Sequence, residues 1–219
     1  MALKAFIFDF DGLIIDTEMP CCNAWIELFN QYGFLFTIED YQKIIGTGHD
    51  LYDPSKHLSQ LINGLLSPQE ILELNRTRTR QLLDSQPMLP GVLDFIIASK
   101  HIGLPLALAS SSNREWIEGY LLKLDIRKYF DIVCTSNDVQ NVKPFPDLFL
   151  LAAQKLGIDP TEALVFEDSH NGIKAAHAAG IRCIAIPNDI TKSTDLSLAS
   201  RIVDSFLEID PQELINSTK

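Results

Sequence analysis

Short apolar runs alternate with helix-length segments along most of the chain. The runs that we expect to form strands are residues 3–8, 104–109, 131–135, 163–166 and 181–186, with a short edge strand at 202–203. Near-continuous apolar strands that alternate with helices are typical of a parallel sheet that is covered on both faces. The pattern therefore predicts an α/β protein with a Rossmann-like three-layer core and a mostly parallel sheet.

A long helical segment separates the first expected strand from the second. Residues 24–29 have apolar side chains at helical spacing, and Ser67 before Pro68 is a typical N-cap of a further helix. Such an interval is too long for a simple crossover between strands. We therefore expect a catalytic core at residues 1–16 and 89–219, and an inserted helical cap domain at residues 17–88 that lies over the strand ends.

Polar side chains follow the ends of several expected strands. Asp9 and Asp11 follow the first strand, Ser110 follows the second, and Glu167 and Asp168 follow the fourth. In open α/β sheets, ligands bind in the crevice beyond the carboxyl ends of the strands. We therefore expect Asp9, Ser110 and Asp168 to converge, although they are far apart in the sequence.

The pair of acids after the first strand is the most informative pattern. Two carboxylates at the end of a buried strand are costly to bury without a partner, and a divalent cation is the obvious one. Gly12 follows directly and permits the tight turn that carries the chain away. A helix cap or plain turn would explain a single Asp, but it explains this DxDG pattern less well.

The chain resembles the haloacid dehalogenase superfamily, in its β-phosphoglucomutase-like group of phosphatases and sugar-phosphate mutases. The four motifs of that family occur in order: Asp9-Phe10-Asp11-Gly12 extended by Asp16-Thr17-Glu18, Ser110, Lys143 in Lys143-Pro144-Phe145-Pro146-Asp147, and Glu167-Asp168-Ser169 followed by Gly172. The match spans essentially the whole chain. It implies a phosphatase that hydrolyses a small phosphorylated metabolite, with a sugar phosphate as one candidate, through an aspartyl-phosphate.

The resemblance also implies a role for each acid of the motifs. Asp9 would attack phosphorus as the nucleophile, and Asp11 would act as general acid and then as general base. The metal would be Mg²⁺, held by the Asp9 carboxylate, the Asp11 backbone carbonyl and Asp168, because hard oxygen ligands suit this ion. Glu167 would support that arrangement from nearby.

Three further motif residues would bind the phosphoryl oxygens. These are Ser110, Ser111 and the cation of Lys143, while Gly12 and Thr17 would support the site. Two plainer interpretations remain open at these positions. The stretch Ser110-Ser111-Ser112-Asn113 could cap the helix that follows it, and an isolated lysine would normally lie on the solvated surface.

The cap segment departs from the mutase pattern of the family. β-Phosphoglucomutases carry a His after the first motif and an Arg in a cap loop, whereas this chain has Met19-Pro20-Cys21-Cys22 and His49 there. These differences favour a phosphatase over a sugar-phosphate mutase. His49 and Arg76 are candidate specificity residues, although a plain loop residue and a solvated helix face fit them as well. Outside the cap segment, Trp116 has apolar neighbours at helical spacing, and we expect it to be a packing residue rather than a stacking platform.

A third alternative is a non-catalytic family member that binds a phosphorylated ligand. The intact set of Asp9, Asp11, Ser110, Lys143 and Asp168 argues against it, because a binding module would need neither nucleophile nor acid.

Composition narrows the classes of partner. The formal net charge is −11, which disfavours nucleic acid because the phosphate backbone requires clustered Lys and Arg. No apolar run approaches the roughly 18–20 residues that span a bilayer, and no signal-peptide pattern is seen.

The four cysteines lack zinc or CxxC spacing, so we expect reduced thiols in a cytoplasmic protein. The oligomeric state is left open, and a monomer is compatible with the sequence.

Overall fold

The chain folds into two compact units. The computed structural model describes residues 2–47 and 52–216. One unit comprises Met1–Ile15 with Met88–Lys219, and the other comprises Asp16–Pro87. At each junction this division lies one residue before the boundary expected from the sequence.

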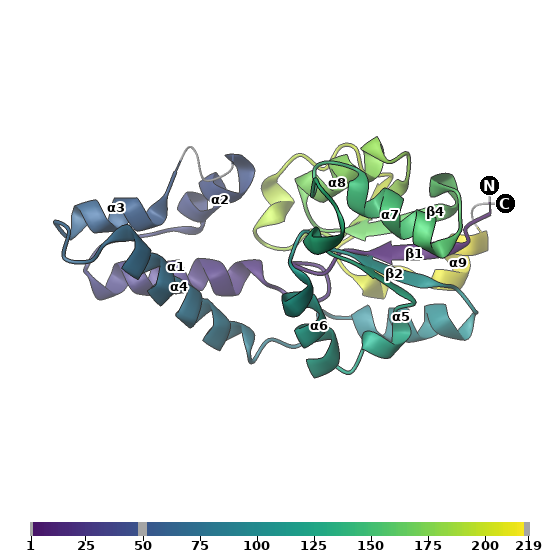
Figure 1. The fold of residues 1–219 in the computed structure, drawn as a ribbon, viewed down its shortest axis with the longest axis horizontal. Coiled ribbons are helices and arrows are strands. Elements are labelled where there is room, and N and C mark those ends of the chain that lie inside the picture. Colours follow the sequence, from purple (N-terminus) through teal and green to yellow (C-terminus); the bar gives the residue numbers. More distant parts are fainter. Residues whose placement is uncertain (1, 48–51, 217–219) are drawn as a thin grey trace. The chain divides into compact units, whose positions relative to one another are not determined.

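The larger unit is built on one parallel sheet (Figure 1). Its described strands are β1 (Ala5–Phe8), β2 (Leu106–Ala109), β3 (Ile132–Cys134), β4 (Ala163–Glu167), β5 (Arg182–Ala185) and β6 (Arg201–Ile202). Their order is β3-β2-β1-β4-β5-β6, and every neighbouring pair is parallel. The chain turns from one half of the sheet to the other beside β1, which is where ligands bind in doubly wound folds.

Helices cover both faces of this sheet (Figure 1). The helices of this unit are α5 (Val92–His101), α6 (Arg114–Lys123), α7 (Asp147–Leu156), α8 (His170–Ala178) and α9 (Pro211–Asn216). Successive side chains of a strand point to opposite faces. Phe6 and Phe8 therefore pack with Phe95 of α5, whereas Ile7 packs with the cluster that contains Phe149 of α7. The predicted three-layer α/β fold is confirmed.

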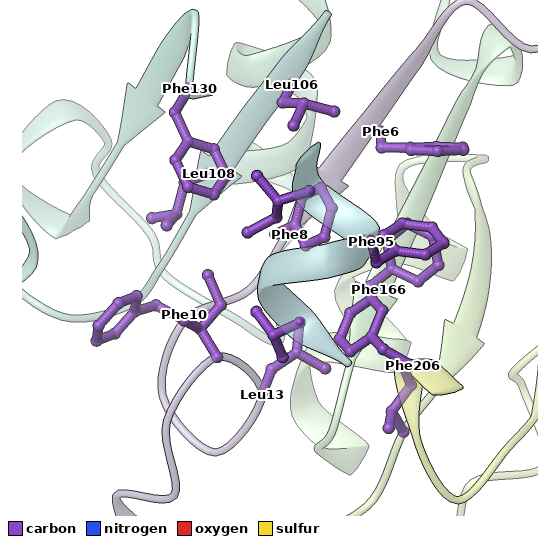
Figure 2. Packing of buried hydrophobic residues seen from close by; sticks show 14 of the residues in the cluster. Phe6, Phe8, Phe10, Leu13, Phe95, Leu106, Leu108, Phe130, Phe166 and Phe206 are labelled. Atoms are coloured by element: carbon purple, nitrogen blue, oxygen red, sulfur yellow. The ribbon is translucent and has the colours of Figure 1, made fainter. Parts of the chain in front are cut away.

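The face beneath α5 is packed with aromatic rings (Figure 2). The ring centroid of Phe95 lies 5.0 Å from those of Phe166 and Phe206, and Phe8 lies 5.1 Å from Phe166. Aromatic pairs at such separations add about 0.5–1.5 kcal/mol to the free energy gained from burying their area. This packing fixes β1 and β4, whose ends carry the polar residues described below.

The smaller unit is helical, as the sequence predicts. Its helices are α1 (Glu18–Gln31), α2 (Ile38–Thr47), α3 (Pro54–Leu61) and α4 (Pro68–Leu83). Ser67 caps α4 as expected, because its hydroxyl accepts from Glu70 N at 3.3 Å while the Glu70 carboxylate accepts from Ser67 N at 2.7 Å. Trp25 of α1 packs on Phe29 with ring centroids 6.4 Å apart. No helix in the described part of the chain is long and apolar enough to cross a membrane.

Candidate active site

Three buried carboxylates meet at the carboxyl ends of β1 and β4. Asp9 is the first residue after β1, and its N–H donates to the Phe166 carbonyl at 3.0 Å, which aligns it with the end of β4. Glu167 and Asp168 stand at that end. Asp9, Glu167 and Asp168 can each offer an oxygen within 4.8 Å of the others. The expected approach of Asp9 and Asp168 is therefore present in the structure.

Lys143 places a buried positive charge among these carboxylates. Only 6% of its side chain is exposed, and its Nζ is paired with Asp9 Oδ1 and with Glu167 Oε1, the latter at 2.6 Å. Its ammonium also lies 4.9 Å from the ring centroid of Phe149. A solvated surface lysine, the plainer interpretation of this position, does not fit these contacts.

The single positive charge of Lys143 does not balance three carboxylates, and the pKa shifts of Asp9 and Lys143 reflect the imbalance. Burial and then the charge of Glu167 raise the pKa of Asp9 to about 8, against the opposing effect of Lys143. Burial alone would lower the pKa of Lys143, but the carboxylates of Asp9 and Glu167 turn the shift upward. A buried set of oxygen ligands with excess negative charge fits a divalent cation.

The side-chain cluster differs from the predicted metal set in one member. Glu167 belongs to it, whereas the Asp11 carboxylate is engaged elsewhere, as described below. The predicted metal ligand of Asp11 is its backbone carbonyl, so the position of its carboxylate does not test that prediction. Asp9 and Asp168 are common to both sets.

Two glycines leave the space that these carboxylates occupy. Gly12 has φ +82°, as expected for its tight turn, and a Cβ there would lie 2.3 Å from Asp168 Oδ2. Gly172 lies in α8, and a Cβ there would lie 1.8 Å from Glu167 Oε1. Any larger residue at either position must displace a carboxylate of the site.

The two residues that lead into α8 hold the Glu167 carboxylate. Glu167 Oε2 accepts hydrogen bonds at 3.1 Å from the backbone N–H of Asp168, the backbone N–H of Ser169 and the Ser169 hydroxyl. Backbone N–H groups at a helix N-terminus stabilise negative charge. Glu167 is therefore held by four donors in all, Lys143 included.

Asn188 orients Asp168, and the sequence analysis missed it. Its Nδ2 donates to Asp168 Oδ2 at 2.7 Å and to the Gly12 carbonyl at 3.4 Å, while its Oδ1 accepts from the N–H groups of Ile190 and Thr191. The signal available in the sequence was its position: Asn188 follows the end of β5, as the other site residues follow β1, β2 and β4.

The Asp11 carboxylate faces α6. Its Oδ2 accepts from the hydroxyls of Ser110 at 3.1 Å and Ser112 at 2.7 Å, and its Oδ1 accepts from the indole N–H of Trp116 at 3.0 Å. The prediction that Trp116 is a packing residue is confirmed, but it does not include the indole hydrogen bond to Asp11. Its ring does pack on Tyr120, with centroids 4.6 Å apart, but its N–H also contacts a predicted catalytic acid.

The serine stretch and the cap of α6 are separate features. Asn113 caps this helix by accepting from Trp116 N at 2.9 Å. Ser110 is buried and reaches Asp11, while Ser111 is exposed. The helix-capping alternative therefore applies to Asn113 and not to Ser110.

The remaining predicted residues lie in the smaller unit. Thr17 precedes α1 but makes no side-chain cap bond, because Asp16 Oδ1 accepts from the first N–H groups of that helix instead. Arg76 is exposed and pairs with Glu73 at 2.9 Å, which agrees with a solvated helix face. His49 lies outside the described residues.

Comparison with known proteins gives consistent matches. A family profile described as haloacid dehalogenase-like hydrolase matches residues 6–186. "Putative phosphatase YhcW" of Bacillus subtilis is 40% identical over 95% of this chain and 94% of its own. Fructose-1-phosphate phosphatase YqaB of Escherichia coli is 36% identical over 82% and 94%. A solved β-phosphoglucomutase from Clostridium difficile shares 25% identity with a TM-score of 0.71, over 99% and 98%.

Proposed function

This chain belongs to the haloacid dehalogenase-like hydrolase family, and on that premise we propose that it is a Mg²⁺-dependent phosphatase. Its substrate would be a small phosphorylated metabolite, with a sugar phosphate as the first candidate. The observation that carries the proposal is the buried group of Asp9, Lys143, Glu167 and Asp168 at the strand ends. Relatives named as phosphatases support the choice of reaction.

Asp9 would be the nucleophile. One of its oxygens forms a bond to phosphorus while the bond from phosphorus to the leaving oxygen breaks, which gives an aspartyl-phosphate. Lys143 holds Asp9 by an ion pair and would also face the phosphoryl oxygens, whose charge its ammonium offsets. Ser110 and Ser111 would donate to the same oxygens.

Asp11 would transfer the protons of both half-reactions. Its carboxyl group gives a proton to the leaving oxygen, and its carboxylate then takes one from the water that attacks phosphorus and releases Asp9. Such transfers typically contribute about 10²–10⁴-fold to a rate. Asp9 and Asp168 would hold Mg²⁺, with Glu167 beside them, and the bound ion offsets the charge of nucleophile and phosphate.

A sugar-phosphate mutase on the same residues is the second candidate, because a solved β-phosphoglucomutase shares the fold. In a mutase the phosphoryl group of Asp9 passes to another sugar hydroxyl and not to water. Isomerised hexose phosphate that forms faster than free phosphate, with a bisphosphate primer present, would favour this alternative.

The test is phosphate release from a panel of phosphorylated sugars, nucleotides and small acids, with Mg²⁺ or with EDTA. We expect turnover that requires Mg²⁺ and that falls below detection in Asp9→Asn. Asp94→Asn, the same change at an exposed residue of α5, is the matched control and should keep the wild-type rate. Release that persists in Asp9→Asn would refute the assignment of the nucleophile.

A further inference from the structure

The Asp11 carboxylate is held by a fixed set of donors that belong to α6 and to the loop before it. Two of them are the hydroxyls of Ser110 and Ser112, and the third is the indole N–H of Trp116. Hydrogen bonds to charged groups are shorter and stronger than those between neutral groups. The three donors thus define one orientation of the carboxylate.

These donors differ in how freely they can be redirected. A serine hydroxyl has one hydrogen and rotates to suit its surroundings, whereas an indole nitrogen is a donor only. If Ser110 donates to a phosphoryl oxygen, as proposed above, its hydrogen no longer serves Asp11. Ser112 also donates its backbone N–H to Ser110 Oγ at 3.0 Å, so its position is tied to the same serine. The Trp116 N–H is a donor that phosphate binding does not redirect, and its ring does not rotate as a hydroxyl does.

Packing holds the Trp116 ring in place. Its backbone N–H is fixed by the Asn113 cap, at the N-terminal end of α6. Its ring lies against Tyr120, one helical turn further on, with centroids 4.6 Å apart. Tyr120 in turn packs against Phe10, the residue that precedes Asp11, with ring centroids 6.1 Å apart.

We infer that Trp116 is a positioning residue, whose indole N–H fixes the orientation of the Asp11 carboxylate for proton transfer to the leaving oxygen. The inference rests on the role proposed for Asp11. Trp116→Phe removes the N–H and keeps an aromatic ring against Tyr120, so it separates the hydrogen bond from the packing.

The first measurement tests the contact without activity. In protein labelled with ¹⁵N-tryptophan, the chain gives two indole N–H signals, from Trp25 and Trp116. Trp116→Phe assigns them by removing one. We expect Asp11→Asn to shift the Trp116 signal and to leave that of Trp25 unchanged. An unchanged Trp116 signal would overturn the inference.

The second measurement tests the consequence for catalysis. Values of kcat/KM, which report only the steps up to departure of the leaving group, are compared for p-nitrophenyl phosphate, whose leaving group needs little protonation, and phenyl phosphate, whose leaving group needs more. Because proton transfer matters most for the poorer leaving group, we expect Trp116→Phe to slow phenyl phosphate about tenfold and p-nitrophenyl phosphate at most about twofold. Equal losses for both compounds would mean a purely structural role and would overturn the inference.

The Asp11→Asn background separates this inference from the proposed function. There, Trp116→Phe should cause no further loss beyond about twofold, because the group that it positions has gone. A further tenfold loss would overturn the inference and leave the role of Asp11 intact. If Asp11→Asn itself has the wild-type rate with phenyl phosphate, the proposed role of Asp11 fails first.

Discussion

Gly172→Ala is the sharpest test of how the carboxylates are accommodated. In a solvated helix this change is favourable by about 0.5–1 kcal/mol. Here the new Cβ would lie 1.8 Å from Glu167 Oε1 and 1.9 Å from its Cδ, so the carboxylate has to move. The movement would disturb the 2.6 Å ion pair with Lys143 and the bonds from Asp168 and Ser169.

The size of the effect follows from these contacts. Forcing an extra methyl group into a packed site costs about 1–3 kcal/mol. Separating a buried ion pair costs about 3–5 kcal/mol when it is complete. Partial separation with some relaxation gives a net loss of about 2–5 kcal/mol in the free energy of unfolding at neutral pH, after the helical gain is subtracted.

The assay is urea unfolding followed by circular dichroism, with two controls. Gly119→Ala is the matched variant, because Gly119 lies in α6 with no atom near its Cβ position, and it should stabilise the protein by about 0.5–1 kcal/mol. In a Glu167→Ala background the clash is absent, so Gly172→Ala should no longer destabilise. A loss below about 1 kcal/mol in the wild-type background would refute the reasoning.

Three further predictions follow from other parts of the larger unit. Asn188→Ala removes the 2.7 Å hydrogen bond to Asp168, and we expect the Mg²⁺ concentration for half-maximal activity to rise about tenfold, measured by titration. Asp138 is partly buried, which opposes ionisation, but bonds such as that from Thr135 N at 2.8 Å hold its pKa below 3.8. The contribution of the ionised Asp138 to stability is therefore complete above about pH 4, and it is lost as the pH falls through the lower folded pKa. Asp138→Asn should lower the free energy of unfolding in urea by about 1–2 kcal/mol at pH 7 and by progressively less in acid. Phe95→Ala opens a cavity among the rings of Figure 2 and should cost about 3–5 kcal/mol in the same assay, whereas a loss under about 1 kcal/mol would contradict the packing described.

The strand ends could be located from the sequence because the apolar runs mark the strands and the residues that follow each run lie at one edge of the sheet. Buried parallel strands appear as continuous apolar runs, and the carboxyl ends of such strands share one edge of the sheet. This link predicts that Asp9 and Asp168 lie close together, as they do in the structure. The resemblance to the haloacid dehalogenase family added Lys143, which no periodicity links to Asp9, and the family is confirmed by the profile match.

Side-chain direction could not be predicted in the same way. Trp116 has apolar neighbours at helical spacing, and that pattern is the same whether or not its N–H finds an acceptor. Asn188 lies in a loop, where the backbone path decides what the amide reaches.

The missed and the predicted residues together explain why the site tolerates its own charge. The amide of Asn188 points at Asp168, the backbone N–H groups of Asp168 and Ser169 point at Glu167, and Gly12 and Gly172 leave room for the two carboxylates. The N–H groups are dipoles that orient the carboxylates without neutralising their charge, and the glycines only provide room. Lys143 supplies one positive charge against three acids. The backbone is thus shaped to keep an excess of negative charge in a fixed arrangement, which is what a cation site needs and what a packed core would exclude.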